Sequence, residues 1–217
     1  MVSNLLEANV ETVLDAAFAD DQEELLVVDP SAETIVSLIE TAVDRDDLPE
    51  MSMLVDERVL KTVMDDFLVA SKAADLVEDG SLALRLLPDS VDNALFVSPS
   101  RVVVLVSTDE HVAALSSDDD EFVAEVFETH RAAFADAAEY GLRTPAISRV
   151  RETLAADIGE QTRDDFDAVL ASMDTAHSAE GLDEVTVSLL VAAKNDVLLY
   201  DISKWGEDVG IASKATF

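Results

Sequence analysis

The sequence contains no cysteine, only six glycines in 217 residues, and only 14 Lys and Arg against 47 Asp and Glu. Without cysteine, neither a disulfide bond nor a thiolate-bound zinc site is possible. Gly80 is the only glycine before Gly141, so a glycine-rich phosphate-binding loop is absent from the first half. No apolar run approaches the roughly eighteen residues that cross a membrane, and the N-terminus lacks the basic segment of a signal peptide. We predict a cytoplasmic protein without a membrane partner, metal or cofactor.

The acidic residues give a formal net charge of −33 and are spread along the whole chain. Hydrophobic residues nevertheless make up 49% of the sequence, which is too much for a disordered acidic chain. Concentrated salt screens the repulsion that so many like charges would cause. The composition therefore favours a folded protein from a halophile over a polycation-binding protein, whose acidic residues we would expect to be gathered in a tail.

Hydrophobic periodicity in the first half predicts helices that alternate with short apolar strands. Ser31 is expected to cap one helix and Gly80 to end another. Two of the strands flank a turn signal at 98–101 and so predict a hairpin. The fold class is α/β, with a mostly parallel sheet that carries this hairpin. The expected helices are 4–18, 31–43 and 57–78, and the expected strands are 25–28, 51–55, 82–86, 94–97 and 102–106.

From Asp118 onward the pattern is helical, with helices expected near 122–140, 146–157 and 163–174. Residues 177–181 are the best linker candidate. We expect three parts: an α/β sensor or dimerisation module over 1–117, a helical connector or dimerisation region over 118–181, and an incomplete helix-turn-helix over 182–217. Two apolar helix faces are candidate dimer interfaces, that of 122–137 and that of 163–174 with Phe166, Val169, Leu170 and Met173.

The last thirty-six residues have the spacing of a helix-turn-helix motif. A first helix with an apolar face begins near Leu182. A second has Asp201 as its expected N-cap, an apolar face formed by Ile202, Trp205 and Val209, and Gly210 as its stop. A third helix is expected to begin at Ile211. Gly206, a poor helix former, is expected where the first two helices approach closely.

The run ISKWGEDVGIASKATF, residues 202–217, resembles the winged helix-turn-helix of archaeal and bacterial transcription regulators. The chain as a whole resembles the haloarchaeal TbsP family of transcriptional regulators. The resemblance implies control of central carbon metabolism genes in response to glucose. Members of that family continue past the equivalent of Phe217 to complete a recognition helix and a wing, so we expect this chain to be truncated.

Four side chains of the C-terminal segment are candidate contacts to double-stranded DNA. Ser213, Lys214 and Thr216 would stand at the start of the recognition helix, where side chains reach base edges and phosphates. Lys204 and Lys214 are candidate phosphate contacts. We expect a homodimer, because such proteins bind two half-sites, and a small-molecule effector bound by the α/β module. On the alternative that the segment is only a helical hairpin, these residues are simply solvated.

Two alternatives belong to other classes of protein. One is a non-enzymatic α/β ligand-binding or scaffold protein that its C-terminal helices dimerise. The other is a metal-dependent hydrolase that uses Asp29 and Asp56, which follow the first two predicted strands. We expect no catalysis, because so many carboxylates make such coincidences common. His111, His130 and His177 have no ligand spacing.

The strand order and lengths also resemble the phospholipase-D-like sensor domains of some archaeal sugar regulators. The His-x-Lys motif of the catalytic members is missing here. The resemblance therefore implies ligand sensing or scaffolding without hydrolysis. The acidic run 118–121 is explained by a helix start after Ser117 as N-cap, because the helix dipole favours acidic residues there.

Overall fold

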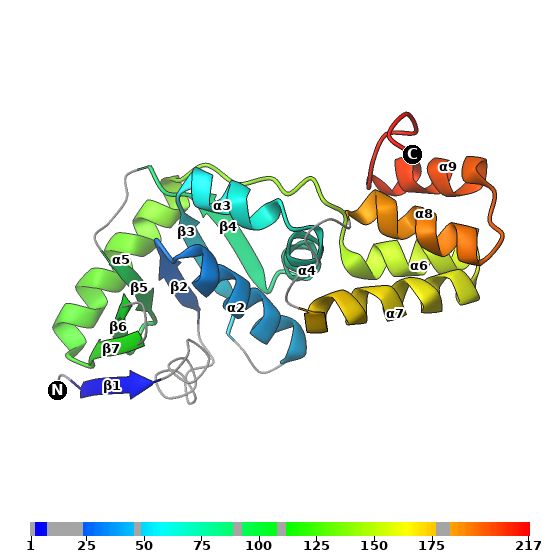
Figure 1. Cartoon of the computed structure of the whole chain (residues 1–217). Helices are drawn as coiled ribbons and strands as arrows, with labels where there is room; N and C mark the ends of the chain where they lie inside the picture. Colours follow the sequence, from blue (N-terminus) through cyan, green and yellow to red (C-terminus); the bar gives the residue numbers. More distant parts are fainter. Residues whose placement is uncertain (1–2, 8–23, 46–48, 89–92, 108–111, 177–182) are drawn as a thin grey trace. The chain divides into compact units, whose positions relative to one another are not determined.

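The computed structural model describes residues 3–7, 24–45, 49–88, 93–107, 112–176 and 183–217. The chain divides into two compact units. The first comprises residues 1–69 and 76–141, and the second comprises residues 70–75 and 142–217. Strands and helices of both units are drawn in Figure 1.

The first unit is built on a single sheet with the strand order β1-β7-β6-β5-β2-β3-β4 among the described residues. Three neighbouring strands are parallel: β2 (Leu25–Val28), β3 (Met51–Val55) and β4 (Leu82–Leu86). All four residues of β2 are buried, because β2 lies inside the sheet and both of its faces are covered. These three strands were all predicted from their apolar runs.

The other half of the sheet is antiparallel, so the prediction of a mostly parallel sheet is wrong. The predicted hairpin is confirmed, and it consists of β5 (Ala94–Val97) and β6 (Val102–Ser107). β5 pairs antiparallel with β2, and β7 (Val112–Ser117) extends the meander. β1 (Ser3–Glu7) is the edge strand at this end of the sheet and pairs antiparallel with β7. The sheet is mixed because only β2, β3 and β4 are joined by helices, whereas the later strands follow one another after a few residues, which is enough only for antiparallel neighbours.

Two strands were not predicted. The sequence predicts a helix over 4–18, but residues 3–7 are β1, and residues 8–18 of that helix lie outside the described part of the chain. β7 has only Val112 and Leu115 as large apolar residues, which is too weak an alternation to indicate a strand. Both strands owe their conformation to pairing with neighbours far away in sequence.

The helices between the parallel strands begin at side-chain caps. Ser31 caps α2 (Ala32–Asp44) as predicted, because its Oγ accepts the backbone N–H of Thr34 at 3.2 Å. The helix predicted over 57–78 is interrupted, and forms α3 (Glu57–Met64) and α4 (Phe67–Glu78). The break lies at Asp66, whose carboxylate accepts the N–H groups of Leu68 and Val69 and so caps a new helix. Gly80 follows α4 with φ +86°, as expected of a glycine past a helix end.

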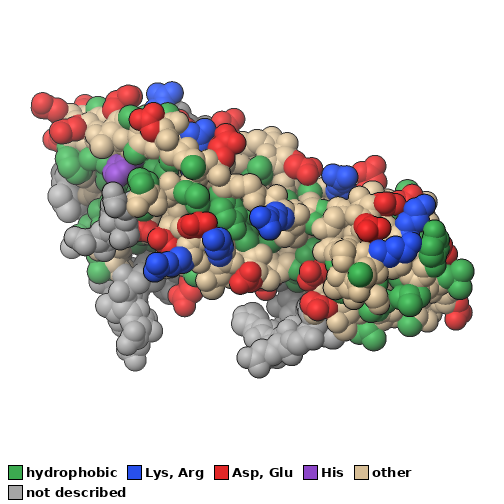
Figure 2. Space-filling view, turned by 90° about the horizontal axis from the view of Figure 1, so that it is seen from above, with side chains coloured by type: hydrophobic (Ala, Val, Ile, Leu, Met, Phe, Trp, Pro, Cys, Tyr) green, Lys and Arg blue, Asp and Glu red, His purple; other side chains and the backbone are tan. Residues whose placement is uncertain are grey.

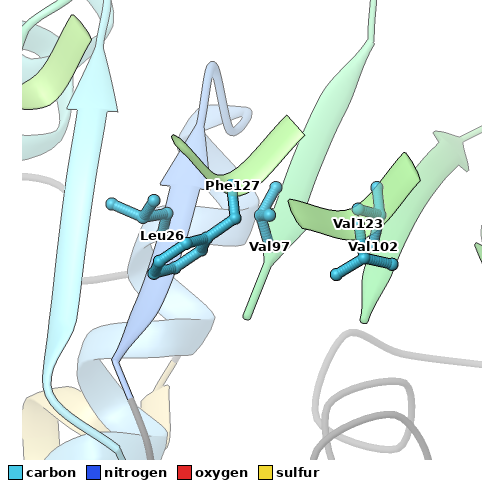
Figure 3. Close-up of a cluster of buried hydrophobic side chains, with 5 residues drawn as sticks. All are labelled: Leu26, Val97, Val102, Val123 and Phe127. Carbon is cyan, nitrogen blue, oxygen red and sulfur yellow. The ribbon is translucent and has the colours of Figure 1, made fainter. Parts of the chain in front are cut away.

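Helix α5 (Asp120–Asp136) packs on one face of the sheet, and α2 lies behind the other face (Figure 3). Val123 and Phe127 of α5 are buried against Leu26, Val97 and Val102 of three strands. Val123 and Phe127, from the apolar face of 122–137 that the sequence offers as a dimer interface, are therefore core of the first unit, whereas Phe122 of that face is 48% exposed. This correction has a simple reason: the open sheet needs a helix on each face, and α5 covers one of them.

The segment that follows α5 is fastened to the edge strand β4. Leu86 donates its N–H to Ala138 O at 2.8 Å, and Tyr140 donates to Leu84 O at 3.0 Å. The Arg85 Nη1 atom donates to the carbonyls of Phe134 and Ala135 at 2.8 Å and of Ala137 at 3.3 Å. Arg85 thus adds a side-chain donor for the carbonyl groups at and just after the end of α5.

The second unit contains four helices among its described residues 142–176 and 183–217. They are α6 (Ile147–Asp157), α7 (Glu160–Ala176), α8 (Glu184–Lys194) and α9 (Leu199–Val209). α6 packs on α7 and α9, and α8 packs on α7 and α9. Phe166 and Leu170 of α7 are buried in this packing, so these two residues of the second candidate dimer interface are core.

The two units do not follow the domain boundaries expected at 117 and 181. α5 belongs with the sheet, whereas α6 and α7 belong with α8 and α9. A helical pattern alone cannot tell a connector from a layer of a core, because both have one apolar face. The predicted linker 177–181 lies outside the described residues.

Candidate nucleic-acid interface

Trp205 anchors α9 within the second unit. Its side chain is buried, and its Nε1–H donates to Oγ1 of Thr153 on α6 at 3.1 Å. Ile202 and Val209, which share its face of the helix, are buried too. The prediction that Trp205 belongs to the core of the helical motif is confirmed. The buried indole nitrogen has a partner, as a buried tryptophan requires.

Helix α9 begins earlier than predicted and ends where predicted. Its N-cap is Leu198 and not Asp201. Asp201 lies in the first turn, where its negative charge interacts favourably with the positive end of the helix dipole. Gly210 adopts the left-handed conformation with φ +94°, and its N–H donates to Gly206 O at 3.1 Å. Ile211 donates to the same carbonyl at 2.9 Å. A residue with a Cβ would be strained at Gly210, which explains the sharp stop.

Gly206 is packed against the ring of Phe217 and not against a neighbouring helix. A Cβ atom at Gly206 would clash with the Cζ and Cε2 atoms of Phe217. The expectation that Gly206 allows the first two helices to approach is therefore corrected. The missing side chain makes room for an aromatic ring of the segment that follows α9.

Residues 211–217 form turns and not the helix predicted to open at Ile211. Thr216 donates its N–H to Ser213 O at 2.8 Å, and the hydroxyl groups of Ser213 and Thr216 lie 2.9 Å apart. The backbone bond closes a four-residue turn over residues 213–216, and the two hydroxyl groups join its ends. The physical reason for the difference is that Gly210 reverses the chain, so residues after it need several positions before helical bonds can form.

The four predicted DNA contacts are all exposed. Lys204 lies on the outer face of α9, and Ser213, Lys214 and Thr216 lie in the segment after Gly210. The Lys214 ammonium nitrogen lies 4.0 Å from the centroid of the Tyr200 ring, in a cation–π contact. Tyr200 and Lys204 are four residues apart on α9 and therefore share a face. In Figure 2, Lys and Arg side chains lie over the second unit, beside exposed hydrophobic side chains at its tip.

Basic side chains without a carboxylate partner are concentrated in the second unit. At least six of the described Lys and Arg residues form ion pairs, such as Arg151 with Asp167 at 2.6 Å and Lys194 with Asp165 at 2.8 Å. Four of the five described cations whose side chains have neither an ion pair nor a hydrogen bond lie in the second unit. The five are Arg58, Arg143, Arg149, Lys204 and Lys214. In a chain with 47 acidic residues, such cations are available to an external anion.

Helix α8, the first helix of the predicted motif, is held by two acidic residues. Asp183 caps it and accepts the Thr186 N–H at 2.7 Å. Hydrogen bonding from the Thr186 side chain, and then from its backbone N–H, lowers the pKa of the Asp183 carboxyl. At the other end, Asp165 of α7 accepts from Lys194 and from the Asn195 amide at 2.9 Å, which lowers the pKa of Asp165. The Lys194 ammonium group therefore joins α8 to α7 through Asp165.

Of the two residues considered for hydrolysis, Asp56 has a structural role as a helix cap. The Asp56 carboxylate caps α3 and accepts the N–H of Arg58 at 2.8 Å, and Asp29 has a positive φ of 51° directly after β2. Within the described ranges, no three His, Cys, Asp or Glu side chains are grouped so as to hold a metal ion. Burial lowers the pKa of His130 on α5, whereas His111 and His177 lie outside the described residues. In the acidic run 118–121, the N-cap of α5 is Asp119 and not Ser117.

The sequence did not indicate Tyr200 or Thr153. Tyr200 could have been found as a large aromatic residue off the apolar face of α9, one turn before Lys204. Thr153 gives no such signal, because its role depends on the packing of α6 against α9. No helix in the described part of the chain is both long and apolar enough to cross a membrane.

Two solved structures resemble the chain distantly. The archaeal chromatin protein TrmBL2, whose structure is described as showing a novel mode of DNA binding, is 22% identical, with a TM-score of 0.47. The match covers 64% of this chain and 54% of TrmBL2, so the chain spans about half of that protein. Nuc, a phospholipase D family member from Salmonella typhimurium, is 13% identical, with a TM-score of 0.44, over 64% of this chain and 99% of Nuc. No curated protein matches the chain.

Two sequence families account for the chain from residue 2 onward. Residues 2–145 match the N-terminal domain of TbsP-like transcriptional regulators. Residues 146–217 match the C-terminal helix-turn-helix domain of the same regulators, and this range begins one residue before α6. The buried Trp205, the left-handed Gly210 and the packing of α6 to α9 are the structural counterpart of that second match. The chain belongs to the family of TbsP-like transcriptional regulators.

Proposed function

We propose that this chain is a DNA-binding transcriptional regulator of a halophilic archaeon, and that it binds double-stranded DNA through Lys204, Ser213, Lys214 and Thr216. One observation carries the proposal: of the five described cations that have neither an ion pair nor a side-chain hydrogen bond, four lie in the helix-turn-helix unit. Phosphate binding requires cations that are not already neutralised by the protein. The exposed hydroxyl groups of Ser213 and Thr216 add donors that suit phosphate oxygens or base edges.

The test is DNA binding by the full-length gene product in molar KCl. Duplexes enriched by the wild-type protein from a random-sequence library serve as the probe, and fluorescence anisotropy gives the dissociation constant. Lys214→Glu should weaken binding at least about tenfold, because it removes a phosphate contact and adds repulsion. Lys61→Glu makes the same change of charge on α3 of the first unit and should stay within about twofold of wild type.

Equal losses in both variants would mean that only net charge matters, and would contradict an interface at Lys214. Failure of the wild-type protein to enrich any duplex would overturn the proposed function itself. Melting curves of both variants establish that each remains folded.

The first unit is proposed to sense a small-molecule effector and to form the homodimer. Control of central carbon metabolism genes in response to glucose is part of this proposal, and it rests on the family resemblance. The measurement is transcript abundance with and without glucose in a strain that lacks the gene and in its parent. Loss of the glucose response of such genes in the deletion strain is the expected result, and an unchanged response would contradict this assignment.

A scaffold or ligand-binding protein that its C-terminal helices dimerise is the second candidate. It is favoured by Leu190, Leu198 and Leu199, which are large apolar residues exposed on α8 and at the start of α9. Under this alternative, Leu198→Ser with Leu199→Ser would dissociate the dimer, as measured by sedimentation, while Lys214→Glu would leave every measured property unchanged.

A further inference from the structure

Tyr200 is an exposed aromatic residue in the helix-turn-helix unit. It is 62% exposed, although an aromatic side chain of this size ordinarily buries most of its surface in a core or an interface. The face of α9 that packs into the unit is formed by Ile202, Trp205 and Val209, and Tyr200 does not belong to it. Its ring therefore contributes little to the core, and its position calls for another explanation.

The neighbours of Tyr200 on this surface are cationic. Lys214 lies over one side of its ring, with Nζ 4.0 Å from the centroid. Lys204 lies one helical turn further along the same face of α9. Neither lysine forms an ion pair with a carboxylate among the described residues. The ring holds the Lys214 ammonium group without neutralising it, because a cation–π contact leaves the charge in place.

This arrangement brings together two unneutralised ammonium groups and one phenol hydroxyl. Lysine and tyrosine side chains are both donors to phosphate oxygens in protein–DNA complexes. We propose that Tyr200 is a DNA-contacting residue, whose hydroxyl donates to a backbone phosphate that Lys204 and Lys214 flank. The inference rests on the proposed function. It adds an uncharged phosphate contact, the Tyr200 hydroxyl, and a ring that holds the Lys214 ammonium group in position.

Tyr200→Phe tests the contribution of the hydroxyl separately from that of the ring. The variant keeps the ring under Lys214 and loses only the donor, so its affinity should fall about three- to tenfold. The slope of log affinity against log salt concentration should not change, because a neutral donor releases no counterion. Lys214→Gln should instead reduce the magnitude of that slope by about one. Tyr140→Phe is the matched control, since Tyr140 is the other tyrosine of the chain and lies in the first unit.

Tyr200→Leu removes the ring as well, so it should weaken binding more than Tyr200→Phe does. Wild-type affinity in Tyr200→Phe, with the Lys214→Gln effect intact, would overturn the phosphate contact and leave the proposed function standing. Absence of DNA binding by the wild-type protein would instead remove the proposed function. If Tyr200→Leu dissociates a dimer in sedimentation while Tyr200→Phe leaves the affinity unchanged, this surface is a contact between copies of the chain, and the inference is wrong.

Discussion

Gly206 lies on α9 and has no Cβ atom, which leaves room for the ring of Phe217. Gly206→Ala would improve the intrinsic helix propensity, yet the added Cβ clashes with that ring. Cζ and Cε2 are the far end of the Phe217 side chain, so movement of the ring can relieve part of the clash, and we expect the free energy of unfolding to fall by about 1 kcal/mol. Trp205 is the only tryptophan and lies in the same unit, so its fluorescence during urea unfolding measures this change.

Phe217→Ala provides the control, because it removes the atoms that the new methyl group would meet. In that background Gly206→Ala should be neutral or stabilising, since only the helix-propensity gain of about 1 kcal/mol remains. An equal loss in both backgrounds would show that the methyl group meets something other than Phe217. The sequence could indicate that Gly206 was special, but it could not indicate the partner, because Phe217 lies in a turn segment without periodicity.

Among the elements, α8 depends on one N-terminal cap. Asp183→Ala should cost about 1 kcal/mol of unfolding free energy at pH 7, because the Thr186 N–H loses its acceptor. Asp183→Asn keeps a capping oxygen but loses the charge, so it should lose less stability than Asp183→Ala. Urea unfolding followed by Trp205 fluorescence compares the three proteins. A loss in Asp183→Asn equal to that in Asp183→Ala would indicate that the charge matters and the cap does not.

The same cap predicts a pH dependence. The folded-state pKa of Asp183 is lowered below its model-peptide value of 3.8. The stability that the carboxylate contributes is therefore present above about pH 3.8 and is lost as the pH falls through the folded pKa. The difference between wild type and Asp183→Ala should shrink in that acidic window. A difference that stayed constant would contradict a cap that depends on the ionised form.

The end of α5 depends on Arg85. Arg85→Met keeps the length of the side chain but removes its hydrogen bonds to three backbone carbonyls. We expect a loss of about 1–2 kcal/mol. Hydrogen exchange should be faster at the amides of Leu86 and Tyr140, which join β4 to the following segment. Unchanged exchange at both amides would show that these backbone bonds persist without the arginine.

Elements with strong local signals could be predicted, and those that depend on distant partners could not. β2, β3 and β4 were recognisable as short apolar runs, and α2 and α9 as amphipathic helices with an N-terminal or C-terminal signal. The direction of β5 against β2 is decided by pairing across the sheet, which no local pattern contains. The break between α3 and α4 at Asp66 could not be predicted, because the apolar residues on either side of it keep the spacing of one continuous helix. At the interface, lysines could be nominated from sequence, but the contact of Lys214 with Tyr200 required the fold.

For the whole molecule, the formal net charge of −33 sets the dependence of stability on salt. Repulsion among exposed carboxylates favours the unfolded chain, in which the charges lie further apart. The Debye length falls from about 10 Å at 0.1 M to about 3 Å at 1 M salt. We expect the melting temperature to rise steeply over this range of KCl concentration and more gently above it.

Tetramethylammonium chloride is a matched control, because it screens charge as KCl does at equal ionic strength. Both salts should raise the melting temperature similarly if screening is the cause. A rise with KCl alone would point to specific cation binding, and a melting temperature independent of salt would contradict the role assigned to repulsion.

The backbone bonds of Leu86 and Leu84 to residues 138–140 have a consequence for assembly. An uncovered edge strand can recruit the edge of a second molecule and extend one sheet across two subunits. Here the carboxyl-terminal half of β4 is already occupied by the chain itself. Dimers that joined two sheets through this part of β4 would first have to displace the protein's own backbone, so any subunit contact made by the first unit is expected to use another surface.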